Sequence, residues 1–236
     1  MTRTVHLAGD STAGPKSRAA APETGWGMAL PYYLDEAVAV ANHARNGRST
    51  RSFITQGRLD AVARDLRADD VLVIQFGHND AKVTDPERHT EPWTSYTEHL
   101  ARFVEVARAA GAQPVLATSV ERRRFDDTGR AVSGHGEYPD AMRALAARED
   151  VPLVDVQRDS LALWHDLGPE RTLHYFFHAD DGRRDDTHFN PPGAGAVARL
   201  VATGLLTAGV LGDHEVRRLD EDVPEEWFRW LDEEPA

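Results

Sequence analysis

Cysteine is absent from this 236-residue sequence, as are long apolar runs and any excess of basic residues. Without cysteine the chain can form no disulfide, no thiolate nucleophile and no cysteine-based metal site. No stretch approaches the roughly 20 consecutive apolar residues that a membrane-spanning helix needs. The 27 basic and 39 acidic side chains give a formal net charge of −12. This balance disfavours partners such as nucleic acids and anionic membranes, because both require a basic face.

A secretion signal is also not evident at the start of the chain, MTRTVHLAGDST, which has one early arginine but no apolar core. If Met1 is the native start, we expect a cytoplasmic protein, although a chain trimmed of a leader would look the same. The length, with 41% hydrophobic and 28% charged residues, is typical of one globular domain.

We expect that domain to comprise residues 1–212. The remaining residues, 213–236, form an acidic tail that contains Trp227, Phe228, Trp230 and Leu231. A fully solvated tail has no need of these aromatic side chains, so we expect it to pack on the domain or on a partner subunit. A homodimer is compatible with that expectation.

Five short apolar runs are predicted to be strands. The clearest, 71–76 (VLVIQF), is almost wholly apolar, is rich in β-branched residues and follows the turn-like Ala68-Asp69-Asp70. Continuous apolarity indicates a strand that is buried on both faces, as in a parallel sheet. The five runs are 5–8, 38–41, 71–76, 115–117 and 153–154.

Helical patterns separate these runs. The stretch 92–110 is predicted to be one helix ending at Gly111, and 138–148 and about 194–206 are predicted to be two more. Segments 84–91 and 122–137 look irregular. The alternation predicts an α/β fold, a three-layer α/β/α sandwich around a mostly parallel five-stranded sheet. The apolar residues expected on one face of 92–110 are Trp93, Tyr96, Leu100, Phe103, Val104 and Ala107.

Ser11 lies in Gly9-Asp10-Ser11-Thr12, directly after the first predicted strand. In such α/β sheets, functional residues are expected at the carboxyl ends of strands. A serine at this junction can present its hydroxyl above the sheet edge, and glycine permits the tight backbone. Taken alone, the motif fits a simple helix cap better than a nucleophile.

His188 lies in Asp185-Asp186-Thr187-His188, just before Pro191-Pro192 and the last predicted helix. An aspartate three residues before a histidine can accept a hydrogen bond from Nδ1–H, which leaves Nε2 free to act as a base. A metal-binding loop or a merely polar loop would also account for this segment, since the chain contains eleven histidines.

Two middle segments could complete the constellation. Asn79 follows the strongest predicted strand in Gly77-His78-Asn79-Asp80, and its amide could donate a hydrogen bond to a developing oxyanion. Gly47, in Asn46-Gly47-Arg48-Ser49, could offer an unobstructed backbone N–H. An Asx-turn and an ordinary glycine turn explain the same residues equally well. All four segments could nevertheless meet at one edge of the sheet.

The four segments, in this order, resemble the conserved blocks of the SGNH (GDSL-type) hydrolase superfamily, which has a flavodoxin-like α/β/α fold. The blocks are GDST, the Gly47 segment, GHND and the D-x-x-H of Asp185 and His188, and they run from residue 9 to residue 188. Within the superfamily, ETGWGMAL, NGRSTRSF, FGHND and DDTHFNPPGA resemble rhamnogalacturonan acetylesterases. The resemblance implies a serine esterase that deacetylates acetylated pectin-type oligosaccharides.

The resemblance also implies the role of each matching residue. Ser11 becomes the nucleophile, His188 the base and Asp185 the carboxylate that orients it. The backbone N–H groups of Ser11 and Gly47 and the side chain of Asn79 become the oxyanion hole. No metal and no organic cofactor is implied.

Other residues are candidates for lesser roles. Asp186 competes with Asp185 for His188, but the family spacing favours Asp185. Arg48 and Arg51 could pair with a uronate carboxylate, or they could form structural ion pairs in an acidic protein. Trp26 could stack on a sugar or lie in the core, and His78 could line the site or support the Asn79 loop. These four residues, Arg48, Arg51, His78 and Trp26, are the candidate substrate-binding residues.

Three other functions compete with this one. The first is an esterase for other acyl groups, either lipase- or thioesterase-like or an acetyl-xylan esterase. The second is a catalytically silent carbohydrate-binding module, which the joint presence of Ser11, Asn79, Asp185 and His188 disfavours. The third is a metal-dependent hydrolase built on His174, His178 and His188, but no H-E-x-x-H pair occurs in the sequence.

Overall fold

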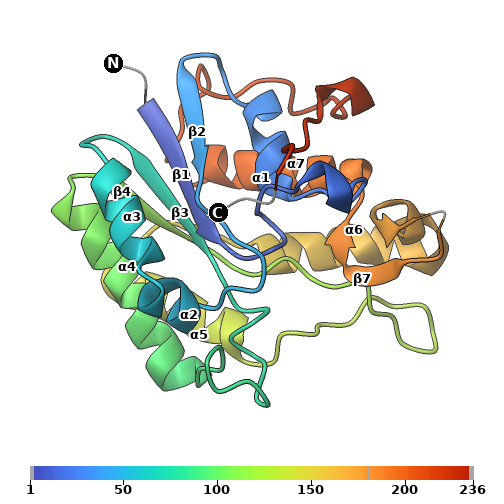
Figure 1. Ribbon diagram of the computed structural model, residues 1–236, viewed down its shortest axis with the longest axis horizontal. Coiled ribbons are helices and arrows are strands. Elements are labelled where there is room, and N and C mark those ends of the chain that lie inside the picture. Colours follow the sequence, from blue (N-terminus) through green and yellow to red (C-terminus); the bar gives the residue numbers. More distant parts are fainter. Residues whose placement is uncertain (1–2, 180, 234–236) are drawn as a thin grey trace.

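A central five-stranded sheet with helices on both faces makes up most of the molecule (Figure 1). The computed structural model describes residues 3–179 and 181–233. All neighbouring strands of the sheet are parallel, in the order β2-β1-β3-β4-β5. The strands are β1 (Arg3–Gly9), β2 (Val38–Asn42), β3 (Val71–Gln75), β4 (Gln113–Ala117) and β5 (Leu153–Val154). The predicted sheet is therefore confirmed.

The helices form one layer on each side of the sheet. One apolar core packs α1 (Trp26–Ala29), α6 (Val156–Arg171) and α7 (Pro191–Thr207) against one face. The other core packs the remaining four helices against the opposite face. These are α2 (Thr50–Thr55), α3 (Arg58–Asp65), α4 (Thr97–Ala109) and α5 (Tyr138–Glu149). Every residue of β3 is buried, because β3 is the middle strand and is covered from both sides.

Five short helical turns complete the helical structure of the described residues. They are η1 (Arg18–Ala20), η2 (Leu30–Tyr33), η3 (Pro92–Tyr96), η4 (Thr172–His174) and η5 (Glu225–Trp227). Four of these turns are 3₁₀ and η3 is π-helical. Segments 84–91 and 122–137 are irregular apart from isolated turns and bridges, as predicted.

The single helix predicted over 92–110 is wrong in its first turn. The backbone N–H of Tyr96 bonds to the carbonyl of Glu91, five residues earlier, and α4 begins only at Thr97. A π-turn breaks the regular 3.6-residue period. Trp93 consequently lies outside the buried face, is 51% exposed and donates from Nε1 to Glu137.

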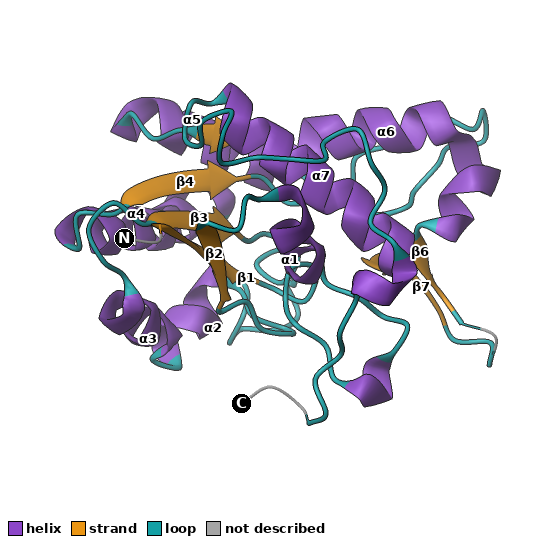
Figure 2. Ribbon diagram, turned by 90° about the horizontal axis from the view of Figure 1, so that it is seen from above, coloured by secondary structure: helices purple, strands orange, loops and turns teal. Residues whose placement is uncertain are grey.

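A second, two-stranded sheet was not predicted. The antiparallel strands β6 (Phe176–His178) and β7 (Arg184–Phe189) lie apart from the central sheet, close to α7 (Figure 2). Phe176 and Phe189 are fully buried, and their rings pack together at a centroid distance of 5.3 Å. Asp185 and His188 therefore belong to a strand that lies outside the central sheet.

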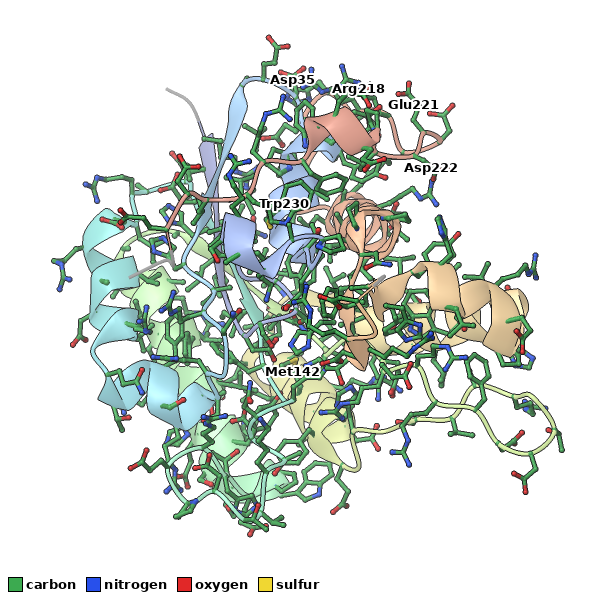
Figure 3. The ribbon with its side chains drawn as sticks, turned by 45° about the vertical axis from the view of Figure 1, so that its right-hand side comes forward. Asp35, Met142, Arg218, Glu221, Asp222 and Trp230 are labelled. Atoms are coloured by element: carbon green, nitrogen blue, oxygen red, sulfur yellow. The ribbon has the colours of Figure 1, made fainter. Side chains whose placement is uncertain are left out.

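The C-terminal tail lies against the N-terminal part of the chain, where Trp230 can be found in Figure 3. Trp230 donates from Nε1 to the carbonyl of Glu23, and Phe228 is 3% exposed. The backbone of Leu231 exchanges hydrogen bonds with Lys16 and Arg18. Among the helices of residues 3–179 and 181–233, none has the length and apolarity needed to cross a bilayer.

Candidate active site

Ser11, His188 and Asp185 form a continuous hydrogen-bonded chain. Ser11 follows the carboxyl end of β1, whereas the other two residues lie on β7, so 177 residues separate the serine from the histidine. Ser11 Oγ is 2.7 Å from His188 Nε2, and His188 Nδ1 is 2.9 Å from Asp185 Oδ2. Since a carboxylate only accepts, Nδ1 carries the proton and Nε2 faces the hydroxyl. This arrangement can deprotonate a serine.

The backbone of β7 holds the Asp185 carboxylate in position. Its Oδ1 accepts hydrogen bonds from the backbone N–H groups of Thr187 at 2.6 Å and His188 at 3.0 Å. Burial by itself would raise the pKa of Asp185, but the hydrogen bond and charge of His188 outweigh it and lower the pKa well below its usual range. Asp185 therefore stays ionised and keeps the His188 ring oriented.

The competing carboxylate, Asp186, points to different partners. Its Oδ1 lies 3.3 Å from Arg123 Nη1 and 3.3 Å from His178 Nε2. Asp186 is therefore engaged with Arg123 and His178, and Asp185 is the carboxylate that bonds to His188.

Asp10 anchors the turn that carries Ser11. This fully buried carboxylate accepts from Thr12 N at 2.9 Å, from Thr12 Oγ1 at 2.8 Å and from His78 Nδ1 at 3.0 Å. Its backbone carbonyl accepts from the N–H groups of Ala13 and Gly14. Burial favours a higher pKa for Asp10, but the charge and hydrogen bond of His78, together with Thr12, lower it to about 2. The serine thus lies on a rigid turn.

Gly47 and Asn79 lie in adjoining segments. Asn79 is 3% exposed and donates from Nδ2 to the carbonyl of Arg48 at 3.0 Å, which uses one of its two amide protons. Gly47 has a left-handed backbone, with φ of +74°. The guanidinium of Arg88 lies over it, with Nη1 3.5 Å from the position that a Cβ would take.

Lys16, which the sequence analysis missed, links the two segments beside Ser11. Its ammonium is buried and contacts the carbonyl of Ser11 at 2.7 Å, Asn46 Oδ1 at 2.7 Å and Glu23 Oε1 at 2.8 Å. It therefore fixes the Ser11 turn relative to the segment just before Gly47. Nothing in the sequence indicates that this lysine is buried, because lysine side chains are almost always exposed.

Asp80 was missed for the same reason. This fully buried carboxylate accepts from Thr50 N at 3.1 Å, Thr50 Oγ1 at 2.5 Å and Thr90 Oγ1 at 3.0 Å. Burial raises the pKa of Asp80 to about 7, although the hydrogen bonds from Thr50 and Thr90 oppose that shift. Asp80 joins the start of α2 to the segment that carries Asn79.

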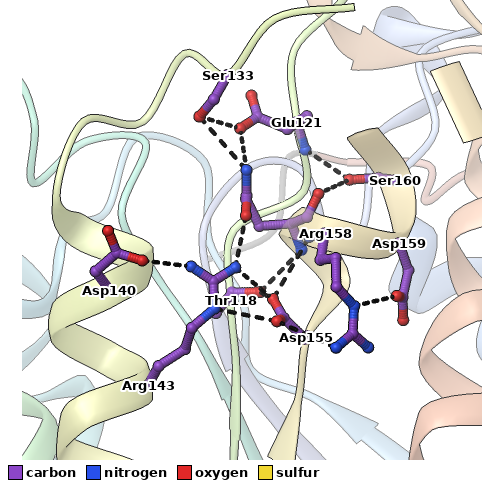
Figure 4. Close-up of polar contacts among 10 residues, drawn as sticks. Thr118, Glu121, Ser133, Asp140, Arg143, Asp155, Arg158, Asp159 and Ser160 are labelled. Atoms are coloured by element: carbon purple, nitrogen blue, oxygen red, sulfur yellow. Dashed lines mark hydrogen bonds and ion pairs between the residues drawn. The ribbon is translucent and has the colours of Figure 1, made fainter. Parts of the chain in front are cut away.

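A second polar network fixes the segment that follows β4 (Figure 4). The buried carboxylate of Glu121 accepts from Ser133 Oγ and Gln157 Nε2, each at 2.7 Å, and from the backbone of Gly134 at 2.9 Å. Nearby, Arg143 joins α5 to Asp155 at the start of α6. Partly buried hydrogen bonds from Ser133 and Gly134 thereby hold the irregular segment 122–137 in place.

Two of the candidate substrate-binding residues are in the wrong place for that role. Trp26 is 1% exposed, packs in the core and donates from Nε1 to Gln75 at 3.0 Å. His78 is 4% exposed and is held by Asp10. Of the two interpretations left open for each residue, the burial of Trp26 favours the core, and the bond from His78 to Asp10 favours a supporting role. Stacking on a sugar requires an exposed ring, which neither residue offers.

Arg48 and Arg51 remain partly exposed beside the site. Arg48 donates to Gln56 Oε1 and to the carbonyl of Asn46, and Arg51 donates to the carbonyl of Pro86. The alternative that they form structural ion pairs finds no support among the described residues, where neither arginine pairs with a carboxylate. Groups of three or more acidic or histidine side chains suited to a metal ion are also absent from that part of the chain.

Comparison with known proteins identifies the family of this chain. Residues 7–196 match the model of the GDSL-like lipase/acylhydrolase family. The chain is 44% identical to rhamnogalacturonan acetylesterase RhgT of Bacillus subtilis, with 91% of this chain and 94% of the relative covered. A probable rhamnogalacturonan acetylesterase of the same organism, YesY, is 39% identical over 89% of this chain and 95% of its own length.

A solved structure agrees with these matches. The crystal structure of YxiM of Bacillus subtilis superimposes with a TM-score of 0.79 at 31% identity, covering 90% of this chain and 58% of that chain. The order of the sequence blocks, the parallel sheet and the matched residues lead to one conclusion: this chain belongs to the GDSL-like lipase/acylhydrolase family.

Proposed function

We propose that this protein is a serine esterase that removes acetyl groups from acetylated rhamnogalacturonan-type oligosaccharides. The observation that carries the proposal is the hydrogen-bonded chain Ser11–His188–Asp185. The curated relatives RhgT and YesY, which carry acetylesterase names, support the substrate class. Membership of the acylhydrolase family makes the protein a carboxylic ester hydrolase.

In the proposed reaction, Ser11 attacks the acetyl carbonyl carbon while His188 Nε2 accepts the hydroxyl proton. The carbonyl π electrons move to oxygen and form a tetrahedral oxyanion. When it collapses, the C–O bond to the sugar breaks and His188 returns its proton to the sugar oxygen. Water, deprotonated by His188, then hydrolyses the acetyl-serine and releases acetate. Asp185 stabilises the imidazolium in each step.

The proposed oxyanion hole consists of the backbone N–H groups of Ser11 and Gly47 and the second amide proton of Asn79. Support comes from the bond between Asn79 and the Arg48 carbonyl, which fixes the amide next to the Gly47 segment. Donors held rigidly in this way stabilise a developing negative charge because they need not reorganise during the reaction.

We assign uronate recognition to Arg48 and Arg51, and we add Arg88. Arg88 lies over Gly47, and the pKa of Arg48 is lowered by burial and then by neighbouring arginines, Arg88 among them. A cluster of guanidinium groups in a chain of net charge −12 favours a substrate that carries carboxylates. Rhamnogalacturonan, with its uronate residues, meets that requirement.

The remaining expectations are proposals of the same kind. We propose that residues 1–212 act as one catalytic domain and that the tail, 213–236, stabilises it through contacts such as Trp230 with Glu23. A cytoplasmic location is to be tested by cell fractionation of the native host. A homodimer is to be tested by light scattering of the purified protein.

The decisive experiment measures acetate release from acetylated rhamnogalacturonan oligosaccharides and from acetyl-xylan, with p-nitrophenyl acetate and octanoate in parallel. Ser11→Ala should lower kcat/KM on every ester by about 10⁵-fold, because the nucleophile is lost. Ser95→Ala is the matched control, since Ser95 lies outside the site and its Oγ accepts a hydrogen bond from the nearby backbone N–H of Glu91.

The outcomes separate the parts of the proposal. Higher kcat/KM on the pectin oligosaccharides than on acetyl-xylan or octanoate would support the substrate class. Preference for octanoate would contradict sugar deacetylation and favour a lipase- or thioesterase-like enzyme. Full activity in Ser11→Ala would contradict the assignment of the nucleophile.

A further inference from the structure

Lys16 is a buried lysine beside the serine of the proposed reaction. Its side chain is fully buried, whereas its ion-pair partner Glu23 is 20% exposed. Burial strips an ammonium group of its hydration, and an ion pair repays that cost only when good geometry and further hydrogen bonds support it. A well-packed apolar side chain in the same place is often at least as stable. Stability alone therefore gives little reason for a lysine at this position.

Lysine is also rare in this chain. Of the 27 basic residues, 25 are arginines, and the two lysines are Lys16 and Lys82. The guanidinium of arginine is a flat fork, whereas the ammonium of lysine is compact and donates in three directions. Three oxygens surround Lys16 Nζ, namely the Ser11 carbonyl and Asn46 Oδ1, each at 2.7 Å, and Glu23 Oε1 at 2.8 Å. This position therefore suits an ammonium group better than a guanidinium.

The contact between Lys16 and Ser11 fixes the backbone on one side of the serine. Lys16 holds the carbonyl of Ser11, which belongs to the peptide that follows the serine. The peptide that precedes it contains the N–H of Ser11 and the carbonyl of Asp10, which accepts from the N–H groups of Ala13 and Gly14. Both peptides that flank Ser11 are therefore held, including the one that supplies its N–H to the proposed oxyanion hole.

The second backbone donor, the N–H of Gly47, is connected to the same lysine. This N–H belongs to the peptide between Asn46 and Gly47, whose carbonyl accepts from Arg48 Nη1 at 2.8 Å. The side chain of Asn46 bonds to Lys16. One ammonium group thus holds the segments of both backbone donors. Their separation matters, because the two N–H groups must reach the same oxygen atom.

The C-terminal tail bonds to both members of the ion pair. The backbone N–H of Leu231 donates to the Lys16 carbonyl at 2.9 Å, and Trp230 Nε1 donates to the Glu23 carbonyl at 2.9 Å. Two neighbouring residues of the tail therefore hold the backbone from which the Lys16 and Glu23 side chains extend. In this way the tail helps to keep the ammonium group beside Ser11.

We propose that Lys16 is a positioning residue of the oxyanion hole, whose ammonium group sets the separation between the N–H groups of Ser11 and Gly47. This role rests on the proposed serine-esterase reaction, because only a reaction with a tetrahedral oxyanion needs such a hole. Lys16 acts through the backbone and does not touch the reacting atoms. Since the oxyanion forms only during the reaction, replacing Lys16 should lower kcat without a matching change in KM.

The test compares Lys16→Met with Lys82→Met in the full-length protein. Methionine is unbranched like lysine but carries no charge and no N–H donor. With p-nitrophenyl acetate, Lys16→Met should lower kcat by about 10²-fold, the cost of a small misplacement of the donors, and leave KM within a few-fold of wild type. Lys82→Met is the matched control, because it removes an exposed ammonium group, and it should change neither constant.

A boronic acid distinguishes positioning from a general loss of structure. Ser11 Oγ adds to the boron of phenylboronic acid, its proton passes to His188, and the tetrahedral boronate resembles the intermediate of the reaction. In Lys16→Met the Kd of phenylboronic acid should rise by roughly tenfold or more. The measurements are made at a temperature at which thermal scans show the variant to be folded. A lower Tm with unchanged kcat and unchanged Kd would mean that Lys16 only stabilises the fold, and would overturn the proposal.

Asn46→Ala is a second variant, which keeps the proposal testable if Lys16→Met does not fold. It removes the acceptor through which Lys16 holds the Gly47 segment and leaves the contacts of Lys16 with Ser11 and Glu23. We expect kcat to fall by about tenfold. The double variant should lose less than the product of the two single losses, because both substitutions break the same link. An unchanged kcat in Asn46→Ala, or losses that simply multiply, would contradict the proposed role.

Ser11→Ala, measured in parallel, distinguishes failure of this proposal from failure of the proposed function. Loss of activity in Ser11→Ala together with wild-type kcat in Lys16→Met would contradict only the role of Lys16. Full activity in Ser11→Ala would overturn the proposed nucleophile and, with it, the role of Lys16. Because p-nitrophenyl acetate contains no sugar, the result does not depend on the substrate class.

Discussion

Asn79 illustrates how much a single side chain depends on its neighbours. Its amide uses one proton to bond to the Arg48 carbonyl, and the other stays available for the proposed oxyanion. Gly77, two residues earlier, has φ of +146°, and a Cβ there would collide with the hydroxyl of Ser119. The backbone turn that aims Asn79 therefore requires glycine.

Asn79→Ala should lower kcat for acetyl ester hydrolysis by about 10²–10³-fold and leave KM within a few-fold of wild type, because an oxyanion donor acts mainly in the transition state. Steady-state kinetics with p-nitrophenyl acetate give both constants. Asn42→Ala is a control for the loss of a partly buried amide, since Asn42 bonds to the carbonyl of Ala13 and not to the Arg48 segment. A raised KM with unchanged kcat would instead place Asn79 in substrate binding.

Residues in short sequence motifs could be recognised from the sequence, whereas residues whose role arises from burial could not. Ser11 and His188 stand in short motifs with a fixed order, so both were predicted, and the structure brings them to hydrogen-bond distance. Lys16 and Asp80 belong to no such motif, and their importance arises from burial. Trp26 was open to two interpretations, and only its packing shows that it belongs to the core.

At the scale of elements, the β6–β7 hairpin and helix α7 act as one unit. The helix starts at Pro191, two residues after β7 ends, and its N-cap Asn190 donates to the carbonyl of Tyr175 just before β6. Gly193, in the first turn, packs directly on that carbonyl. The position of His188 therefore depends on how closely the helix approaches Tyr175.

Gly193→Ala should lower the Tm by about 5 °C or more, because the added Cβ would collide with the Tyr175 carbonyl oxygen and lie 2.8 Å from its carbon. The activity should fall as well, since the collision moves the hairpin that carries His188, the proposed base. Thermal unfolding and p-nitrophenyl acetate hydrolysis measure the two effects. Thr203→Ala, at an exposed position of α7, should change neither. An unchanged Tm in Gly193→Ala would show that helix α7 does not pack closely on the Tyr175 carbonyl.

At the scale of the whole molecule, buried ionisable groups couple stability to pH in opposite directions. The lowered pKa values of Asp10 and Asp185 give stability that is lost as the pH falls below about 4. Burial lowers the pKa of His135 well below its ordinary value. Protonation of His135 at low pH therefore also destabilises the folded state relative to the unfolded state. Asp80 acts in the other direction, because its pKa is raised to about 7.

The folded state binds the Asp80 proton more tightly than the unfolded state, so this group's contribution to stability declines as the pH rises from about 4 to about 7. Asp80→Asn keeps an acceptor for Thr50 but removes the charge. The Tm of Asp80→Asn relative to wild type should therefore rise by several degrees between pH 5 and pH 8. Comparing the two proteins at each pH cancels the contributions of the other groups.

Asp127→Asn makes the same charge change at an exposed position, and its Tm difference from wild type should stay constant across that range. If the Tm difference between Asp80→Asn and wild type also stays constant with pH, the pKa of Asp80 is not raised in the folded state. The same scans should be made in one buffer series, since the chain carries a formal charge of −12 at pH 7 and less near its pI of about 5.3.

The sequence by itself determined the fold class and which residues are candidates for the reaction. Apolar runs such as 71–76 specify strands wherever both faces are buried, and the short motifs around Ser11 and Asp185 need fixed residue types at fixed spacing. These are local properties, and a linear chain records them directly.

Only the tertiary structure decided which residues meet and which are hidden. The bond between Ser11 and His188 closes a loop of 177 positions, and the burial of Lys16 depends on Glu23 and Asn46. Burial and charge compensation arise from many distant residues at once. No short window of sequence contains them.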